Sequence, residues 1–268
     1  MAVAFLMRRM PRTYSRLAGR RPTWSYSQNG EDLVLANLLG PADGRIYIDL
    51  GCGHPVLGSD TYVLYRNGWR GLVVDGDPKH AKPFRRARPR DTFVPAILTA
   101  DGREVRFSDR DQKSSASPEW HALDPPESEP VARSSVAVQA LLDSKVPAGT
   151  KVGLLKVDVE NLDAEILMAI DLGKLDPDAI MVEQTCFWNE DVQKRSLTRF
   201  LDEHGYGCAY HNFVNNIYIR RHTPEQRAAH DFQRYVDLAA KSDAQAAATR
   251  KTPGPKRAPG RKKAEPTS

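Results

Sequence analysis

Five short apolar runs, each ending in polar or acidic residues, set the strongest limit on how this chain can fold. They are RIYIDL at 45–50, GLVVD at 71–75, TFVPAIL at 92–98, VGLLKVD at 152–158 and DAIMVEQ at 178–184. Continuous apolar runs, unlike alternating ones, are typical of strands buried on both faces of a parallel sheet. A helix-compatible or loop stretch follows each run, so the pattern predicts repeated strand–helix–strand units.

Two later segments complete the expected architecture. NLDAEILMAIDLGKL carries Leu162, Ile166, Leu167 and Ile170 on one helical stripe, and a second helix is expected to stop at Gly205. The stretch CAYHNFVNNIYIRR then predicts two short strands joined by an Asn-rich turn. A hairpin of this kind would place an antiparallel strand at the end of an otherwise parallel sheet.

The basic character of the chain comes from its two ends. Residues 1–21 hold six Arg and no acid, and residues 250–268 hold seven Lys or Arg against one Glu. The rest of the chain carries 26 basic and 33 acidic residues, a net charge of −7. We therefore expect no nucleic-acid surface on the folded domain, and we leave open a weak contact of the basic tails with an anionic surface.

Composition divides the chain into four expected parts. They are a basic N-terminal segment (1–24), one α/β domain (25–222), a C-terminal helix (223–249) and a disordered basic tail (250–268). The tail has too little apolar surface to bury. Within the domain, residues 109–134 are rich in Ser, Pro and charge and are long for a loop, so we expect a lid or a variable insertion there.

The cysteines and the N-terminus bear on the cellular setting. Cys52, Cys186 and Cys208 are widely spaced and have neither CxxC nor zinc-ligand spacing, so no disulfide framework is expected. The N-terminus places Arg after its apolar patch, the reverse of a secretory signal, and no run of about 18 apolar residues occurs. These features favour a reduced, cytoplasmic protein.

A glycine-rich turn follows the first run, in YIDLGCGHPVLGSDT. Asp49 lies at the end of the expected strand, one residue before the end of the run, and Gly51 and Gly53 follow, so the backbone can approach a ligand beside a carboxylate. The later Gly58, with Pro55 before it, departs from the dinucleotide-binding pattern, and the acid would oppose a pyrophosphate. A ligand with a positive amino-acid end, such as S-adenosylmethionine, suits the turn better, the alternative being a plain strand-to-helix turn.

Acids also end two other runs. Asp75 ends the second run, where a nucleoside ribose is commonly held, although DGDP is also an ordinary turn. Asp158 ends the fourth run and Glu160 follows, so both are candidates for general-base work or, alternatively, for capping the next helix. His54 is either catalytic or a turn residue. A divalent metal shared by Asp158 and Glu160 lacks an obvious third ligand, so no metal is predicted.

Together these blocks resemble the FkbM-like family of S-adenosylmethionine-dependent methyltransferases. The resemblance spans roughly residues 26–221 and rests on several blocks in the same order: SYSQNGED, YIDLGCGHPVLGSDTYVLYRNGWRGLVVDGDP, LLKVDVENLDAEIL, PDAIMVEQT and GYGCAYHNFVNNIYIRR. Two positions depart from the family pattern. Asn161 replaces a glycine, and NNIYI replaces an aromatic ending while keeping Asn215 and Tyr218.

The resemblance implies a Rossmann-like methyltransferase fold: α/β, with a mostly parallel seven-stranded sheet, an antiparallel last strand and helices on both faces. It implies transfer of a methyl group from S-adenosylmethionine to a hydroxyl on a small molecule such as a sugar or natural product, or on a glycoconjugate. It also implies that residues 25–32 lie over the mouth of the site. Two other functions stay open: a non-catalytic ligand-binding or scaffold protein, and an NAD-dependent oxidoreductase, which the glycine spacing disfavours.

The resemblance also assigns roles to individual residues. The expected cofactor-binding residues are Gln28, Asp49, Gly51, Gly53, Asp75 and Asp101. Among them, Asp49 and the two glycines would hold the methionine end, Asp75 the ribose and Asp101 the adenine side. Asp158, with Glu160 or His54, would be the base or the group that orients the acceptor.

Overall fold

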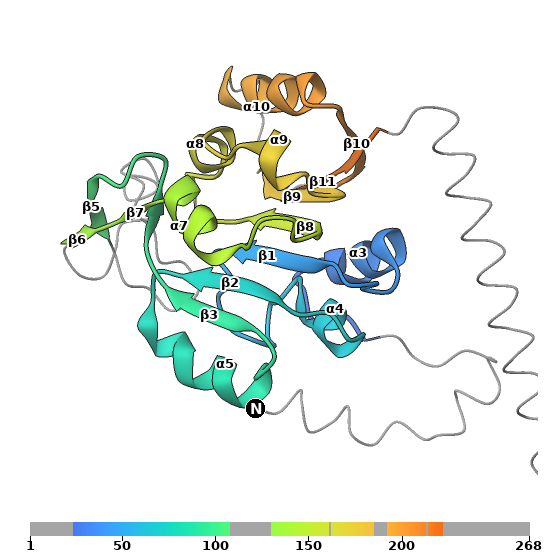
Figure 1. The fold of residues 1–268 in the computed structure, drawn as a ribbon, viewed down its shortest axis with the longest axis horizontal. Coiled ribbons are helices and arrows are strands. Elements are labelled where there is room, and N and C mark those ends of the chain that lie inside the picture. Colours follow the sequence, from blue (N-terminus) through green and yellow to red (C-terminus); the bar gives the residue numbers. More distant parts are fainter. Residues whose placement is uncertain (1–23, 108–129, 161, 185–191, 213, 222–268) are drawn as a thin grey trace, which may run out of the picture. The chain divides into compact units, whose positions relative to one another are not determined.

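A seven-stranded, mostly parallel sheet forms the centre of the computed structural model, which describes residues 24–107, 130–160, 162–184, 192–212 and 214–221 (Figure 1). The strand order is β10-β11-β9-β8-β1-β2-β3. Their bounds are β1 Ile46–Leu50, β2 Gly71–Asp75, β3 Thr92–Pro95, β8 Val152–Val157, β9 Ala179–Glu183, β10 Tyr206–His211 and β11 Asn215–Arg220. Strand β11 runs antiparallel to both neighbours, so the predicted fold class is confirmed. The antiparallel strand lies between β9 and β10, one place in from the edge.

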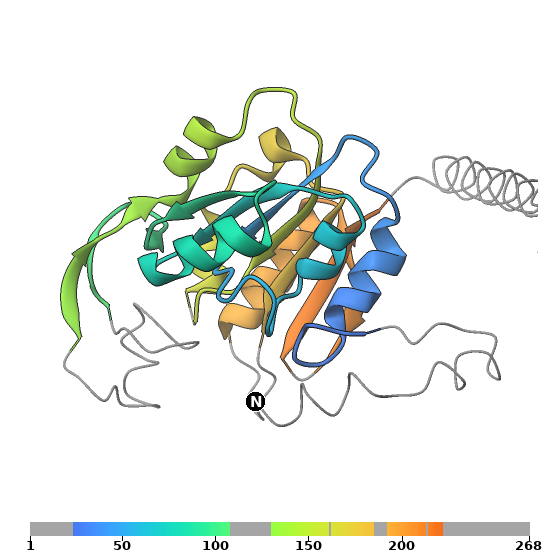
Figure 2. The same ribbon diagram turned by 90° about the horizontal axis from the view of Figure 1, so that it is seen from below.

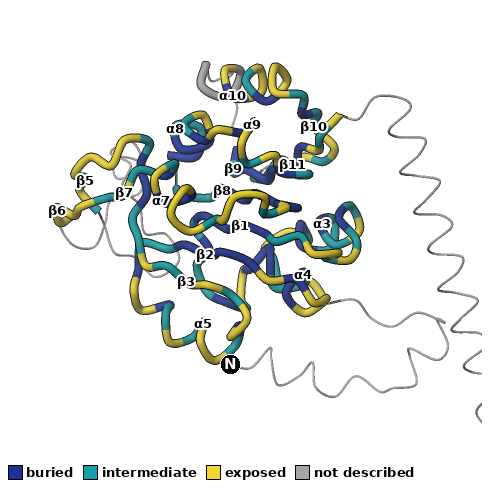
Figure 3. Tube along the Cα trace, in the orientation of Figure 1, coloured by how far each residue is buried: buried dark blue, intermediate teal, exposed yellow. Residues whose placement is uncertain are grey.

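Helices cover both faces of this sheet. The described helices are α3 Glu31–Leu39, α4 Tyr62–Arg66, α5 Ala81–Ala87, α7 Val138–Lys145, α8 Asp163–Met168, α9 Leu172–Leu175 and α10 Val192–Glu203, with a 3-10 turn η2 at Pro78–His80. One core joins α3, α4 and α5 to alternate strand residues such as Tyr47 and Val73. The other core joins α7, α8, α9 and α10 to the intervening residues, such as Ile48 and Val74. Strands β1, β2, β8 and β9 are consequently buried along most of their length, whereas the edge strands β3 and β10 are more exposed (Figure 3).

Two predicted elements are divided in the structure. The third run was expected to be one strand over 92–98, but β3 ends at Pro95, and Leu98–Thr99 form β4, which pairs with β7 (Val136–Ala137). Proline has no N–H to donate and is tolerated here because β3 is an edge strand. The predicted helical stripe is buried as expected, but its helix is split into α8 and α9 because Asp171 caps the N-terminus of α9.

The expected segments outside the core are only partly described. Strand β5 (Glu104–Phe107) pairs with β6 (Val131–Ser134), and this ribbon extends beyond the seven-stranded sheet (Figure 2). It takes up the end of the expected lid, while residues 109–129 lie outside the described residues. So do the expected N-terminal segment except Trp24, the C-terminal helix and the tail. None of the described helices is long and apolar enough to cross a membrane.

Two buried acids at the start of α3 organise the segment that precedes it. Asp32 accepts hydrogen bonds from the Ser25 hydroxyl at 2.8 Å and the Tyr26 N–H at 2.7 Å. Glu31 accepts from Asn212 at 2.7 Å and from Asn215 at 3.0 Å, near the C-terminal end of the described residues. These acids therefore join the opening segment to the turn before β11. This role is additional to the favourable interaction of acids with the N-terminus of a helix.

The pKa of Glu31 reflects the hydrogen bonds that its carboxylate accepts. Burial by itself would raise the pKa, but hydrogen bonds from Asn215, the backbone of Glu31 itself, Asn212 and Asn29 lower it to about 2. A carboxyl with a lowered folded-state pKa stabilises the fold above its unfolded pKa, and the contribution is lost as the pH falls toward the folded value.

We therefore expect Glu31→Gln to lower the free energy of unfolding by about 2 kcal/mol at pH 7. The difference from wild type should shrink between about pH 5 and pH 2, where Glu31 itself becomes protonated. Denaturant titrations at several pH values measure this. Glu203→Gln, at an exposed position on α10, is the control and should change stability by less than about 0.5 kcal/mol. An equal deficit for Glu31→Gln at pH 7 and pH 3 would contradict the assignment.

Candidate active site

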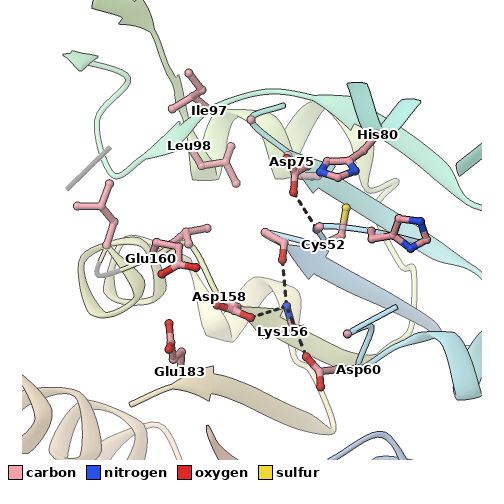
Figure 4. Close-up of a pocket in the computed structure, with 18 of the residues that line it drawn as sticks. Cys52, Asp60, Asp75, His80, Ile97, Leu98, Lys156, Asp158, Glu160 and Glu183 are labelled. Atoms are coloured by element: carbon pink, nitrogen blue, oxygen red, sulfur yellow. Dashed lines mark hydrogen bonds and ion pairs between the residues drawn. The ribbon is translucent and has the colours of Figure 1, made fainter. Parts of the chain in front are cut away.

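A cavity lies at the carboxyl ends of β1, β2, β8 and β9 (Figure 4). This is the edge at which ligands bind in open α/β sheets. Seven of the nine residues predicted for the site line it: Gln28, Gly51, Gly53, His54, Asp75, Asp158 and Glu160. The other two, Asp49 and Asp101, do not.

The two glycines of the turn after β1 have different surroundings. Both have positive φ, 79° at Gly51 and 55° at Gly53. A Cβ on Gly51 would lie 1.7 Å from the carbonyl oxygen of Asp158, whereas a Cβ on Gly53 would have nothing within 4 Å. The N–H of Gly53 donates to Asp75 at 2.8 Å. Gly51 thus allows two strand ends to approach each other, and Gly53 borders open space in the cavity.

Lys156, which the sequence reasoning missed, lies beneath this turn. It is only 3% exposed, and its Nζ is 3.2 Å from Asp49 Oδ1, 3.1 Å from Asp158 Oδ2 and 3.7 Å from Asp60 Oδ2. It also donates to the carbonyl of Gly51 at 3.1 Å. Burial by itself would lower the pKa of Lys156, but Asp158, Asp49 and Asp60 hold it well above its ordinary value. A lysine inside an apolar strand run was the available signal.

The side chain of Asp49 is buried in the protein interior and does not line the cavity. It is 1% exposed and accepts a hydrogen bond from the Thr61 hydroxyl at 2.6 Å, in addition to its ion pair with Lys156. Arg88 donates in turn to Thr61 at 3.0 Å and forms a buried ion pair with Asp91. The first acid of the motif is thereby held by Thr61 and, from the neighbouring strand, by Lys156.

Two predicted roles receive no support from the geometry. The exposed carboxylate of Asp101 pairs with Arg103 outside the cavity lining. His54 lines the cavity, but its Nδ1 accepts hydrogen bonds from the backbone N–H groups of Val56 and Leu57 at 3.1 and 3.0 Å. The remaining ring nitrogen of the neutral imidazole therefore carries the proton, so His54 is poorly arranged to act as a base. Burial, and then the neighbouring His80, lower its pKa.

Asp158 also belongs to a second group of acids, which does not include Asp49 or Asp60. Carboxylate oxygens of Asp158, Asp163 and Glu183 lie within 4.8 Å of one another. Glu183, at the end of β9, is a further residue that sequence reasoning missed, although the run DAIMVEQ carried its acid. Burial and the charges of Asp158, Asp163 and Glu160 raise the pKa of Glu183 to about 9, and it is hydrogen-bonded to Asp158.

Apolar side chains form the opposite side of the cavity. Ile97, Leu98 and Phe107 line it, and Figure 4 shows Ile97 and Leu98 across from Glu183. The cavity is therefore polar at the ends of β8 and β9 and apolar beyond the end of β2.

The sequence profile of the methyltransferase FkbM domain matches residues 49–208. This chain belongs to the FkbM methyltransferase family. The match begins at Asp49 and includes the glycine turn, Lys156 and the acids at the ends of β8 and β9, and it confirms the resemblance seen in the sequence. The cofactor of this methyltransferase is S-adenosylmethionine.

Several solved structures are similar to this chain at low sequence identity. The O-methyltransferase from Bacillus cereus is 11% identical, with 78% of this chain and 88% of that chain covered and a TM-score of 0.42. Precorrin-6y C5,15-methyltransferase from Geobacter metallireducens is 17% identical, with 75% of this chain and 94% of that chain covered and a TM-score of 0.39. A TehB-like methyltransferase from Corynebacterium glutamicum is 12% identical, with 78% of this chain and 94% of that chain covered and a TM-score of 0.39. Similarity at this level does not indicate an acceptor, and no curated protein matches the chain.

The two glycines provide a matched test of this geometry. Gly51→Ala is expected to lower the free energy of unfolding by about 3 kcal/mol or more, because the new Cβ collides with the backbone of Asp158. Gly53→Ala should cost only about 1 kcal/mol, from its positive φ alone. Chemical denaturation of both variants measures the difference. Equal losses would show that the turn does not press against β8 as described.

Proposed function

We propose that this methyltransferase is an O-methyltransferase that acts on a hydroxyl of a small molecule such as a sugar or natural product, or of a glycoconjugate. The carboxylates of Asp158 and Glu160 beside the glycine turn support this most directly. A hydroxyl is a weak nucleophile until its proton leaves, whereas a neutral amine needs no base to attack. A carboxylate-rich acceptor side therefore suits oxygen better than nitrogen.

The chemistry of the cavity fits S-adenosylmethionine, which supplies an electrophilic methyl group when bound. The backbone of Gly51 and Gly53, together with Gln28 in the same cavity lining, is suited to the methionine end, and the surrounding carboxylates favour its positive charge. Asp75 lies where ribose hydroxyls are held. We assign the adenine to the apolar side formed by Ile97, Leu98 and Phe107, in place of Asp101.

The acceptor side rests on Asp158. One of its oxygens contacts Lys156, which holds the side chain in place at the end of β8, and its side chain is 31% exposed. In this position it can take the acceptor proton or orient the acceptor oxygen toward the methyl group, with Glu160 beside it. We further place the enzyme in the cytoplasm, a setting that its widely spaced cysteines favour.

Formation of S-adenosylhomocysteine by the purified full chain tests the proposed reaction. Acceptors are offered as matched pairs of polyhydroxylated compounds and their amino analogues. We expect turnover with hydroxyl members only. Methylation of the amino analogues alone would refute oxygen specificity, and saturable cofactor binding without turnover on a broad panel would favour a non-catalytic binding protein.

Asp158→Asn separates cofactor binding from methyl transfer. The variant should bind S-adenosylhomocysteine like wild type, because its polar contacts are nearly conserved, but kcat should fall by about 10²-fold to 10⁴-fold, the usual contribution of an acid–base group. Calorimetry and steady-state kinetics measure the two effects, with Glu203→Gln as the control. An Asn variant with full activity would remove Asp158 from the acceptor site.

A further inference from the structure

Three acids from three separate elements meet at the edge of the cavity. Asp158 follows β8, Asp163 is the first residue of α8 and Glu183 ends β9, and Figure 4 shows Asp158 and Glu183 at neighbouring strand ends. Their oxygens lie within 4.8 Å of one another. Ligands on opposite sides of a Mg²⁺ or Ca²⁺ ion are about 4 to 5 Å apart, because each oxygen lies about 2.1 to 2.4 Å from the ion. The separation of these oxygens is therefore compatible with an ion bound between them.

The charge balance of the cavity favours a cation at this point. The described residues that line it include five acids, but Lys156 is the only lysine or arginine among them. Its ammonium group is already close to Asp49, Asp60 and Asp158. The carboxylate oxygens of Asp158, Asp163 and Glu183 lie within 4.8 Å of one another, so their negative charges repel one another. A divalent cation between these carboxylates would offset that repulsion.

A fourth oxygen points independently to a ligand. Asn215 is 7% exposed and lines the same cavity, and its amide nitrogen donates to Glu31. Its Oδ1 is buried and has no hydrogen-bond partner among the described residues. Asn215 pairs in register with Glu183 across β9 and β11, so the two side chains are neighbours on one face of the sheet. A side-chain carbonyl oxygen is a common ligand of hard cations.

We propose that Asp158, Asp163, Glu183 and Asn215 bind a hard divalent cation of the Mg²⁺ class beside the acceptor site. An all-oxygen set of three carboxylates and one amide selects Mg²⁺, Mn²⁺ or Ca²⁺ over softer metals. The remaining coordination positions are open to water or to an acceptor oxygen. Binding of the ion does not depend on the proposed function, whereas a catalytic role of the ion rests on that function. In that role, Asp158 orients the acceptor hydroxyl through the ion, and the ion also lowers the pKa of that hydroxyl.

Titration of the chelator-treated full chain with Mn²⁺, followed by electron paramagnetic resonance, tests the site. We expect one saturable site, from which excess Mg²⁺ displaces Mn²⁺. Glu183→Gln should weaken binding by about tenfold or more. Because Gln has nearly the size of Glu and its amide group can donate to Asp158, this variant should keep its fold, which thermal denaturation checks. Asp163→Asn is a second variant with the same expected loss, and Glu203→Gln, outside the cluster, should bind like wild type.

Two results would overturn the proposal. The first is no saturable Mn²⁺ binding by the wild-type chain. The second is binding that is unchanged in folded Glu183→Gln and Asp163→Asn, because the ion would then lie elsewhere. Neither methyl donor nor acceptor is present in the titration, so its outcome does not depend on whether the chain methylates oxygen.

Discussion

The buried ammonium group of Lys156 is the interaction on which the rest of the site depends. From the middle of the sheet it contacts Asp49, Asp60 and Asp158, and it binds the carbonyl of Gly51. Removing one partner of such a group leaves buried charges uncompensated, which is more costly than the pair is worth when intact. The turn after β1 and the end of β8 are therefore held together by charge as well as by the strand pairing, and the cavity opens where they meet.

A second connection closes the cavity from the ends of the described chain. Glu31, at the start of α3, accepts hydrogen bonds from the side-chain amides of Asn212 and Asn215 in the last hairpin. The amide nitrogen of Asn215 donates to Glu31, while its buried Oδ1 has no hydrogen-bond partner among the described residues. The segment containing Gln28 and strand β11 thus form adjoining parts of the cavity wall, and the proposed cation would join them to the strand-end acids.

Local pattern was sufficient to predict most of the architecture. Strands buried on both faces need continuous apolar runs, and all five predicted runs contain a strand of the main sheet. The errors occurred where one side chain overrides the pattern: Pro95 ends β3 early and Asp171 starts a separate helix. The terminal hairpin was also predicted, but its insertion beside β9 depends on pairing between distant strands, which local patterns do not contain.

The sequence by itself determined which residues end the strands, and therefore that glycines and acids gather at one edge of a parallel sheet, because strand direction and burial are encoded locally. Only the tertiary structure decided what each of those residues contacts. It paired Asp49 with Lys156, left Asp101 outside the cavity, brought Glu183 close to Asp158 and placed Asn215 opposite Glu183 on the neighbouring strand. The reason is physical: the charge state and partners of a buried group depend on atoms that lie far away in sequence and meet only when the sheet is assembled.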